Sequence, residues 1–574
     1  MKDIKQIVLM VMAILQTKGK KLFILVALFG FFTSIIDVLS ISLLAGFAAA
    51  ANDFAFITNN NFLSYIYTVL EFESPVKFVV YFGITLIAIY IIRVAVILLN
   101  SYLISHFCYD RFQFLVTTTF KNYLQYSINH FANRNNSDLT RIVTHESRQV
   151  AEMFVAMFVM VSEFMVFILF LALMLYVNWA GTIIFSAILL VFTFALLSIT
   201  SQRLKNAGEC LVAATQSQYR ILASAFGNQR IFKFLQSLTT IHNKYKKAAQ
   251  NSAISQIKIN TLQHIPRLGL EFIGILLMIS AITAFVYIKQ SNTLKLVPLM
   301  LLFALAMYRL LPSFNRVLTA YNKVIATTES LKVVFQELNK KPEMLGDNKI
   351  GFTKKITLQN INVCFNNDTQ LLHDINLTIN KSDKITIIGK SGHGKSTLLD
   401  IITGLIAPTK GTILVDGVVL SGDNMKSWRS KIAYVPQDIF LFDGDVKENV
   451  LLGRKYDYEC LEKVLKQVEI WDFLTSQQGL NTKVGDGGTI ISGGERQRIA
   501  IARALYGNPE ILLLDEITSA LDKKTANRIL TKIYSEYNKL TIITVTHRLE
   551  AVHKQQIILQ LQNGELYLLD NDRV

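Results

Sequence analysis

The sequence has few cysteines, and their spacing fits neither a disulfide framework nor a metal site. Its 574 residues include four, Cys108, Cys210, Cys364 and Cys460, each far from the others along the chain. Paired spacing marks a zinc module, and an even set of close cysteines marks a disulfide-stapled domain. Both classes are therefore excluded, and we expect four inert thiols.

Other common signals are also missing. No small-residue cleavage pattern follows Met1–Gly19, so we expect an amphipathic helix on the cytoplasmic surface rather than a removable signal peptide. No segment repeats another. No module combines aromatic and basic residues as nucleic-acid binding requires, so we assign the formal net charge of +16 to basic loops at a membrane and expect no nucleic-acid partner.

Apolar residues are abundant, and they are concentrated before about residue 322. The chain is 51% hydrophobic, with a mean hydropathy of +0.36, which is too apolar for an ordinary soluble enzyme. Six segments each exceed the roughly 20 residues that a helix needs to cross a bilayer. They are Leu22–Ala51, Val76–Phe107, Glu152–Val177, Trp179–Thr200, Leu262–Ile288 and Leu296–Leu318.

The loops between these segments predict their orientation. Asp110–Arg148 and Gln202–Lys258 are long and rich in Lys and Arg, whereas Asn52–Pro75 has acidic residues and neither Lys nor Arg. Basic loops stay on the cytoplasmic side. Both termini are therefore expected in the cytoplasm.

The last third of the chain contains a nucleotide-binding pattern, G-x-x-x-x-G-K-S. The β-branched strand Lys384–Ile388 leads into it, and a helix is expected to begin near Lys395. Glycines let the loop's N–H groups point at phosphate oxygens, and the helix N-terminus favours the anion further. Lys395 would reach the β- and γ-phosphates, and Ser396 would bind Mg²⁺. The expected nucleotide-binding residues here are Gly389, Lys390, Ser391, Gly392, His393, Gly394, Lys395, Ser396 and Thr397.

An acidic pair follows a second strand. Ile511–Leu514 is entirely apolar, which is typical of a strand buried on both faces. It would deliver Asp515 toward Mg²⁺ through water and leave Glu516 to polarise the attacking water. The chain is therefore expected to use ATP and Mg²⁺ and to hydrolyse the nucleotide.

With Gln437, the Ser-Gly-Gly-Glu signature and His547, these motifs resemble in order and spacing the ATP-binding cassette of membrane transporters. The resemblance implies that Gln437 senses Mg²⁺ and that His547, after the strand Thr541–Thr546, contacts the γ-phosphate. Asp522 would end the loop that crosses the dimer interface. Asn367 stands where the family often has an adenine-stacking aromatic residue. The signature residues Ser492, Gly493, Gly494 and Glu495 would cap the ATP bound to a second cassette.

This resemblance implies both the domain organisation and a partner. A membrane domain of six helices, of exporter type, would occupy residues 1–327, a linker residues 328–350, and an α/β P-loop ATPase domain residues 351–574. The tips of the cytoplasmic loops, near Asn133–Arg141 and Ser217–Lys233, would couple the two domains. With one cassette per chain, the protein is expected to work as a homodimer.

Four arginines lie inside or at the edge of the apolar segments, where charge is costly and usually faces a cavity. They are Arg93, Arg267, Arg309 and Arg316. Arg309 and Arg316 are two helical turns apart, roughly 10 Å along one face, and guanidinium forks suit phosphate oxygens. Structural ion pairs are the alternative. Glu271 lies one turn from Arg267, and Asp37 is an available partner for Arg309 or Arg316.

A closer resemblance covers most of the chain. Ala306–Arg316, Ile265–Glu271 and Thr482–Gly488 resemble segments of the bacterial lipid-linked oligosaccharide flippases that serve protein N-glycosylation and O-antigen export. Asn52–Glu73 is similar to their small external helix, although a loop helix on the membrane surface is an alternative. The resemblance implies an undecaprenyl-pyrophosphate-linked glycan as cargo, moved across the bacterial inner membrane. An exporter of lipid A, phospholipid or drugs, and a soluble cassette ATPase acting on DNA or ribosomes, are the other hypotheses.

Overall fold

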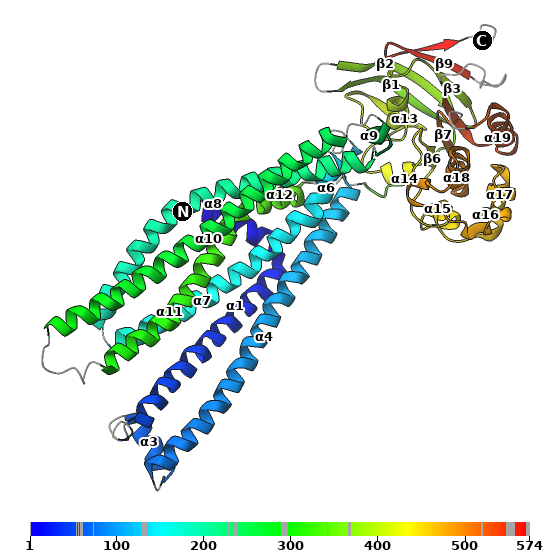
Figure 1. Cartoon of the computed structure of the whole chain (residues 1–574). Coiled ribbons are helices and arrows are strands. Elements are labelled where there is room, and N and C mark those ends of the chain that lie inside the picture. Colours follow the sequence, from blue (N-terminus) through cyan, green and yellow to red (C-terminus); the bar gives the residue numbers. More distant parts are fainter. Residues whose placement is uncertain are drawn as a thin grey trace. The chain divides into compact units, whose positions relative to one another are not determined.

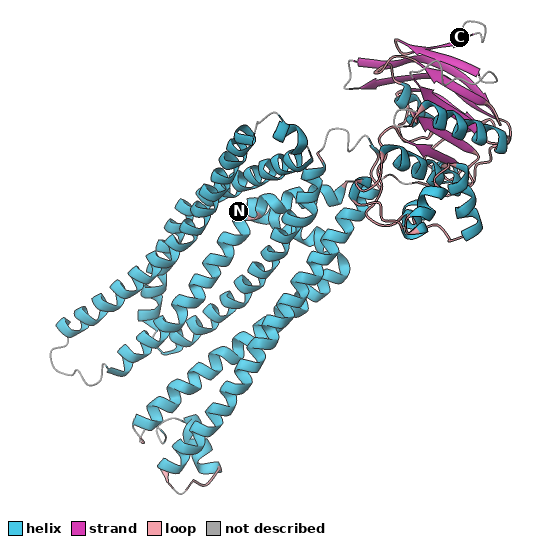
Figure 2. Ribbon diagram, turned by 45° about the vertical axis from the view of Figure 1, so that its right-hand side comes forward, coloured by secondary structure: helices cyan, strands magenta, loops and turns pink. Residues whose placement is uncertain are grey.

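The computed structural model divides the chain into two compact units. Unit 1 comprises Met1–Leu124 and Asn133–Lys341, and unit 2 comprises Gln125–Ala132 and Pro342–Val574. The residues that the structure describes are 2–52, 54, 57, 61–72, 74–128, 135–177, 179–227, 229–234, 238–288, 297–340, 343, 345–365, 369–517, 521–546 and 557–569. Figure 1 labels the elements, and Figure 2 shows helices throughout unit 1 and the strands gathered in unit 2.

Long helices build unit 1. Five of the six predicted apolar segments lie wholly within one of them, and Leu296–Leu318 does so except for Leu296, which is outside the described residues. The long helices are α1 (Lys2–Asn52), α4 (Pro75–Leu124), α7 (Ser147–Val177), α8 (Trp179–Gly227), α10 (Leu238–Ile288) and α11 (Val297–Ala326). By length and composition, four helical stretches of the described residues can cross a membrane, and each lies within or overlaps one of α1, α4, α7 and α8. The crossing by α10 and α11 stays a prediction.

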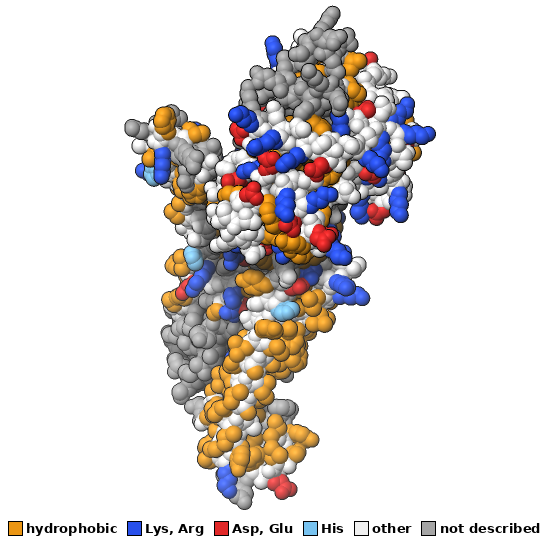
Figure 3. Space-filling view, turned by 90° about the vertical axis from the view of Figure 1, so that its right-hand side faces the viewer, with side chains coloured by type: hydrophobic (Ala, Val, Ile, Leu, Met, Phe, Trp, Pro, Cys, Tyr) orange, Lys and Arg blue, Asp and Glu red, His pale blue; other side chains and the backbone are white. Residues whose placement is uncertain are grey.

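On the face shown in Figure 3, hydrophobic side chains gather over the described parts of the long helices, whereas charged side chains are spread over unit 2. On α4, for example, Ile84, Ile87 and Ile91 are each more than half exposed. Apolar surface of this extent is unfavourable in water and favourable against lipid. The exposure of α4 is therefore that of a membrane helix.

The amphipathic segment expected at the N-terminus is the first part of α1. The helix is broken at Gln16, whose φ is 51°. Before the break, one face is buried at a helical spacing of three and four residues. Its residues are Ile7, Met10, Val11, Ile14 and Leu15, which share a core with side chains of α4, α7 and α12 (Thr328–Asn339). This part of the chain is thus anchored in unit 1.

Shorter helices lie at the ends of the long ones. The helix predicted within Asn52–Glu73 is confirmed as α3 (Asn61–Val69), and Leu63 shares a small core with Phe78 of α4. The others are α6 (Asn136–Arg141), the π-helical turn η1 (Ile142–Glu146) and α9 (Gln229–Phe234). Within the predicted linker, α12 packs in unit 1, where Leu331 and Val334 are fully buried.

Unit 2 contains two sheets among its described strands. The antiparallel sheet has the order β2 (Thr369–Asn380), β1 (Lys355–Phe365), β4 (Lys410–Val415) and β5 (Val418–Val419). The second sheet has the order β10 (Glu565–Leu569), β9 (Ile557–Gln562), β3 (Lys384–Ile388), β8 (Thr541–Thr546), β7 (Ile511–Asp515) and β6 (Ile432–Val435). Its strands are parallel except for β10. The three strands predicted around the nucleotide motifs are confirmed as β3, β7 and β8.

Helices cover the sheets of unit 2. They are α13 (Lys395–Ile402), α14 (Met425–Arg429), α15 (Val446–Leu451), α16 (Tyr458–Gln467), α17 (Trp471–Ser476), α18 (Gly493–Tyr506) and α19 (Lys523–Glu536), with 3₁₀ turns η3 (Gly479–Asn481) and η4 (Asp486–Gly488). α13 begins at Lys395 as predicted. β7 is buried along its whole length between two apolar cores. Helices on both faces account for the continuous apolar run of this strand.

A buried ion pair closes the turn between α6 and α7. Arg141 Nη1 donates to Glu146 Oε1, and the two side chains are 4% and 0% exposed. Ser147 Oγ donates to the carbonyl of Ile142 at 3.0 Å, which holds the same π-helical turn.

Glu146→Gln should destabilise unit 1, because it removes the carboxylate that is paired with the buried Arg141 guanidinium, at a cost of about 3–5 kcal/mol. A clear fall in the midpoint of thermal unfolding of the detergent-solubilised protein is expected. Arg148→Gln is the matched control, since Arg148 and Glu152 form an exposed pair at 3.8 Å. Such a pair is worth at most about 1 kcal/mol. Equal midpoints for the two variants would contradict the prediction.

Candidate functional site

The phosphate-binding loop joins β3 to α13 and depends on three glycines. Gly392 and Gly394 have φ of 84° and 95°, in the left-handed region that favours glycine, and Gly394 is the N-cap of α13. A Cβ on Gly389 would lie 2.4 Å from the carbonyl oxygen of Leu561 in β9. The loop therefore turns sharply while packed against the sheet, as a backbone cradle for phosphate requires.

Side chains of the loop are already ordered. Lys395 is 6% exposed, and its ammonium donates to the carbonyls of Gly389 at 2.9 Å and Lys390 at 3.0 Å. His393 Nδ1 accepts from the N–H of Asn563, at 3.3 Å, in the turn between β9 and β10. Ser396, by contrast, is exposed at the start of α13. The lysine charge is thus held at the loop, and the serine hydroxyl is accessible.

A buried carboxylate lies beside this serine. Asp515 ends β7, is 2% exposed, and accepts from the Tyr434 hydroxyl at 3.2 Å through Oδ2. Its Oδ1 has no hydrogen-bond partner among the described residues. Burial raises the pKa of Asp515, although the hydroxyls of Ser396 and Tyr434 act against this shift. Burial, with a contribution from Asp515, also raises the pKa of Asp400 to about 6.

The oxygen atoms of Asp515 and Ser396 are ligands that fit Mg²⁺. The ion prefers carboxylate, hydroxyl and water oxygens, and its charge would reverse the cost of burying acids here. The orphaned Oδ1 of Asp515 and the accessible hydroxyl of Ser396 supply such oxygens. Tyr434 and Asp400 were not identified from the sequence. A sequence signal existed for Tyr434: it lies in the strand before Gln437, β6, which pairs in parallel with β7, the strand that ends at Asp515.

Glu516 and Gln437, predicted from separate motifs, are brought together. Gln437 Nε2 donates to Glu516 Oε2 at 2.9 Å. Glu516 has a φ of 50°, and its N–H donates to the carbonyl of Val545 in β8 at 3.0 Å. A non-glycine residue in this region is strained, and such strain is common at active sites. The carboxylate is half-buried beside Asp515, at the carboxyl edge of the sheet.

The signature opens α18. Ser492 is the N-cap, its Oγ accepts from the N–H of Glu495 at 3.3 Å, and the Glu495 carboxylate accepts from the N–H of Ser492 at 2.8 Å. This is a capping box, so glutamate serves locally where the family more often has glutamine. Gly493 and Gly494 form the first turn, at the positive end of the helix dipole.

Asp522 caps α19 by accepting from the N–H of Thr525 at 2.9 Å, and these hydrogen bonds to Thr525 lower the pKa of Asp522. Two further residues of the predicted cassette, His547 and Asn367, lie outside the residues that the structure describes.

Two of the four predicted arginines line one cavity of 320 Å³ in unit 1. Arg93 of α4 donates to Asp37 of α1 through Nε at 2.7 Å, and Arg316 of α11 pairs with Glu163 of α7 at 2.5 Å. The lining consists of Gly30, Thr33, Ser34, Asp37, Arg93, Ile97, Asn100, Ser162, Glu163, Val166 and Arg316. Sequence reasoning did not identify Glu163, which lies far from Arg316 in the chain.

The other two arginines differ. Arg267 is exposed on α10, and within the described residues it makes no ion pair with Glu271. The side chain of Arg309 lies outside the described part of the chain. The cavity is therefore defined by Arg93 and Arg316.

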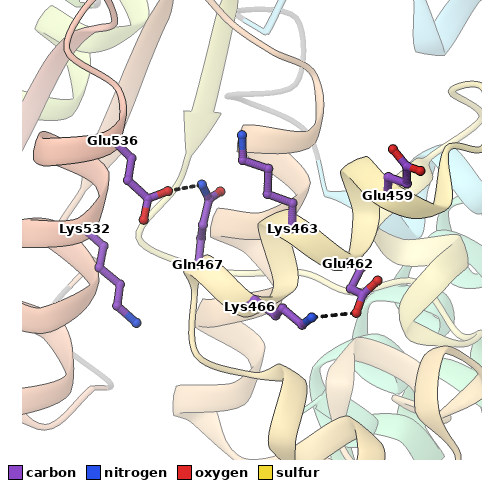
Figure 4. Close-up of a pocket in the computed structure, with 7 residues that line it drawn as sticks. All are labelled: Glu459, Glu462, Lys463, Lys466, Gln467, Lys532 and Glu536. Carbon is purple, nitrogen blue, oxygen red and sulfur yellow. Dashed lines mark hydrogen bonds and ion pairs between the residues drawn. The ribbon is translucent and has the colours of Figure 1, made fainter.

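A second hollow, of 410 Å³, lies between α16 and α19 in unit 2. Figure 4 shows its lining of acids, lysines and one glutamine, which are Glu459, Glu462, Lys463, Lys466, Gln467, Lys532 and Glu536. Gln467 donates to Glu536, and Lys466 pairs with Glu462 at 2.7 Å. Lys532 donates to Glu469 at 2.8 Å. Paired surface charges of this kind provide no convergent ligand site.

Comparisons with known proteins agree with this geometry. Residues 23–311 match the family model of the ABC transporter transmembrane region, and residues 372–519 match that of the ABC transporter ATPase domain. The chain is 28% identical over 448 residues to the heterocyst differentiation ATP-binding protein HepA of a Nostoc species, covering 76% of this chain and 72% of the relative. It is 27% identical over 490 residues to the ATP-dependent lipid A-core flippase of Pseudoalteromonas translucida, covering 82% of each.

Among solved structures, a bacterial Atm1-family ABC exporter with ATP bound has the same fold, with a TM-score of 0.79 at 21% identity, covering 95% of this chain and 93% of that one. One family model alone matches half of the sequence, and the P-loop, acidic strand and signature have the local geometry of an ATPase. The chain therefore belongs to the ABC transporter family, as an ATP-hydrolysing transporter with an exporter-type membrane domain and a cassette that uses ATP and Mg²⁺.

Proposed function

We propose that the protein is a homodimeric flippase that moves an undecaprenyl-pyrophosphate-linked oligosaccharide from the inner to the outer leaflet of the bacterial inner membrane. The observation that carries this proposal is the polar cavity of unit 1, where Arg93 and Arg316 lie among apolar helices. Charge in such a place is costly and is usually kept for a function. The cavity thus points to an anionic cargo.

The arginines favour a phosphate group over a purely apolar cargo. A guanidinium is planar and offers paired donors that match two phosphate oxygens. Arg316 lines the cavity with a side chain that is 45% exposed and pairs there with Glu163. In this proposal Arg309, two turns earlier on the same helix, and Arg267 on α10 add to the positive lining. The glycan needs few specific contacts, and α3 meets the polyprenyl tail on the outer side.

In this proposal the ATPase residues have the roles that their motifs predict. The loop N–H groups and Lys395 would hold the phosphates of ATP, and Ser396, Asp515 and Gln437 would supply oxygens for Mg²⁺, which would neutralise phosphate charge. Glu516 orients and polarises the attacking water, and Gln437 holds the Glu516 carboxylate until that water is bound. His547 contacts the γ-phosphate. Ser492–Glu495 of one subunit cap the nucleotide of the other, and Asp522 lies near the dimer interface.

Export of lipid A is a second candidate, because several relatives carry that name. Flipping assays in reconstituted vesicles separate the two proposals. Faster ATP-dependent translocation of pyrophosphate-linked glycolipid than of lipid A supports the first, and the reverse order supports the second. The membrane domain would then select among anionic lipids by headgroup.

Glu516→Gln should abolish ATP hydrolysis while ATP stays bound, because the water loses its polarising carboxylate and the phosphate cradle is intact. We expect a loss of at least about a hundredfold in the rate of phosphate release, in the range for removal of a general base. The measurement is phosphate release together with retention of labelled ATP. Near-normal hydrolysis would remove Glu516 from this role.

Mixing subunits tests the shared site. A subunit with Lys395→Ala and a subunit with Gly493→Asp should each be inactive as homodimers. In the mixed dimer both lesions fall on one site, so the other site has a wild-type loop and signature. ATPase activity should therefore partly return after co-expression. Half activity in each homodimer, unchanged by mixing, is the opposite result and contradicts shared sites.

Replacing both Arg309 and Arg316 with Ala should reduce flipping of the pyrophosphate-linked glycan steeply. Each charge-assisted hydrogen bond lost is worth roughly 1.5–3 kcal/mol, less where water fills in. The loss of flipping should greatly exceed any loss of ATPase activity measured without lipid. Lys replacements should rescue only partly, because an ammonium does not bind two oxygens as a planar fork does. Normal flipping by the Ala variant means that these arginines are structural.

A further inference from the structure

The cavity of unit 1 is lined by two acids as well as two arginines. Asp37 comes from α1, Arg93 from α4, Glu163 from α7 and Arg316 from α11. The four formal charges sum to zero. A cargo phosphate that entered this cavity would meet arginines that already have partners. The pairing of Asp37 and Glu163 with these arginines therefore contributes to ligand selection by the cavity.

The two ion pairs differ in geometry. Arg93 donates through both Nε and Nη2 to one oxygen of Asp37, the side chains are 20% and 9% exposed, and the guanidinium lies 5.1 Å from the centre of the Tyr90 ring. Arg316 is 45% exposed, and it uses its fork. Its Nε lies 2.5 Å from Glu163 Oε1, and its Nη2 donates to Oε2 at 3.1 Å. Arg93 is held in place, whereas Arg316 is paired but accessible.

We propose that Glu163 is a positioning and specificity-determining residue, a counter-ion that occupies the Arg316 fork until a cargo phosphate displaces it. This inference rests on the proposed function. Through one hydrogen bond and one close ionic contact, the Glu163 carboxylate engages the two nitrogens, Nη2 and Nε, that a phosphate would use. Glu163 therefore keeps the guanidinium oriented and partly desolvated without a ligand, and it competes with any ligand that arrives.

Competition of this kind sets both affinity and selectivity. The apparent affinity for cargo falls in proportion to the fraction of Arg316 that is free. A ligand without two suitably placed anionic oxygens gains too little to displace the carboxylate, so neutral lipids are rejected. When the cargo leaves, Glu163 restores the pair and prevents rebinding. The acid thus favours release as well as discrimination.

The test is ATPase stimulation by lipid, with the full-length dimer in nanodiscs and undecaprenyl pyrophosphate bearing a short glycan as the probe. Glu163→Gln should lower the half-stimulating concentration of this lipid by about tenfold, since it removes a charged competitor from a partly desolvated site. Thermal unfolding and dimer assembly are measured in parallel. Failure of this variant to fold or to dimerise shows a structural role and overturns the proposal.

A second substitution tests whether the effect of Glu163→Gln depends on Arg316. In an Arg316→Ala background, Glu163→Gln should give no further gain, because there is no guanidinium fork left to compete for. A gain of the same size in both backgrounds means that Glu163 acts through bulk charge, which overturns the proposal.

Glu152→Gln is the matched control. Glu152 pairs with Lys323 at 2.9 Å between the same two helices, α7 and α11, and is not part of the cavity lining. The lipid concentration that gives half-maximal stimulation of the Glu152→Gln variant should equal that of the wild type. If the wild type responds to the lipid and Glu163→Gln leaves that concentration unchanged or raises it, the counter-ion role is wrong and the proposed function stands. If the wild type does not respond to the lipid, the proposed function fails, and this inference fails with it.

Discussion

The parallel pairing of β3, β8, β7 and β6 is the constraint on which the ATPase site depends. Parallel strands end at the same edge, so residues far apart in the sequence meet there. The glycine loop follows β3, the acidic pair Asp515–Glu516 stands at the end of β7, and Gln437 follows β6. The hydrogen bond from Gln437 to Glu516, and the Tyr434 hydroxyl on Asp515, are direct results of this register. A one-residue slip of β7 would reverse the faces of its side chains and separate these groups.

The membrane unit obeys a different constraint. Its helices satisfy their own backbone hydrogen bonds, so the sequence is free to place apolar side chains on all outward faces. A charge buried among such helices is stabilised where another helix supplies its partner. The pairs Arg93–Asp37 and Arg316–Glu163 join α1 to α4 and α7 to α11 in this way. The polar cavity is thus a place where helix packing and charge compensation coincide.

These two constraints explain how much the sequence predicts. Strands Lys384–Ile388 and Thr541–Thr546, and the helix start at Lys395, follow from local patterns and are confirmed. The long apolar helices likewise follow from local composition. Tertiary partners are not local. Glu163 lies far from Arg316 in the sequence, so no local pattern connects the two residues. The segment that forms α12 is predicted as part of the linker, although Leu331 and Val334 are fully buried in unit 1. In each case the structural role depends on a contact between helices that are far apart in the sequence.

The cassette and the cavity share a physical feature, although they lie in separate units. In both, a charged group is held in place before its ligand binds. Lys395 donates to carbonyls of its own loop, and Asp515 has a buried oxygen without a partner in the described structure. Arg316 is paired with Glu163 at an accessible edge. Pre-positioned charges lose little conformational entropy when the ligand arrives, so more of the binding energy discriminates between ligands. A transporter must also release its ligands, and the internal partners of Lys395 and Arg316 are available to replace them.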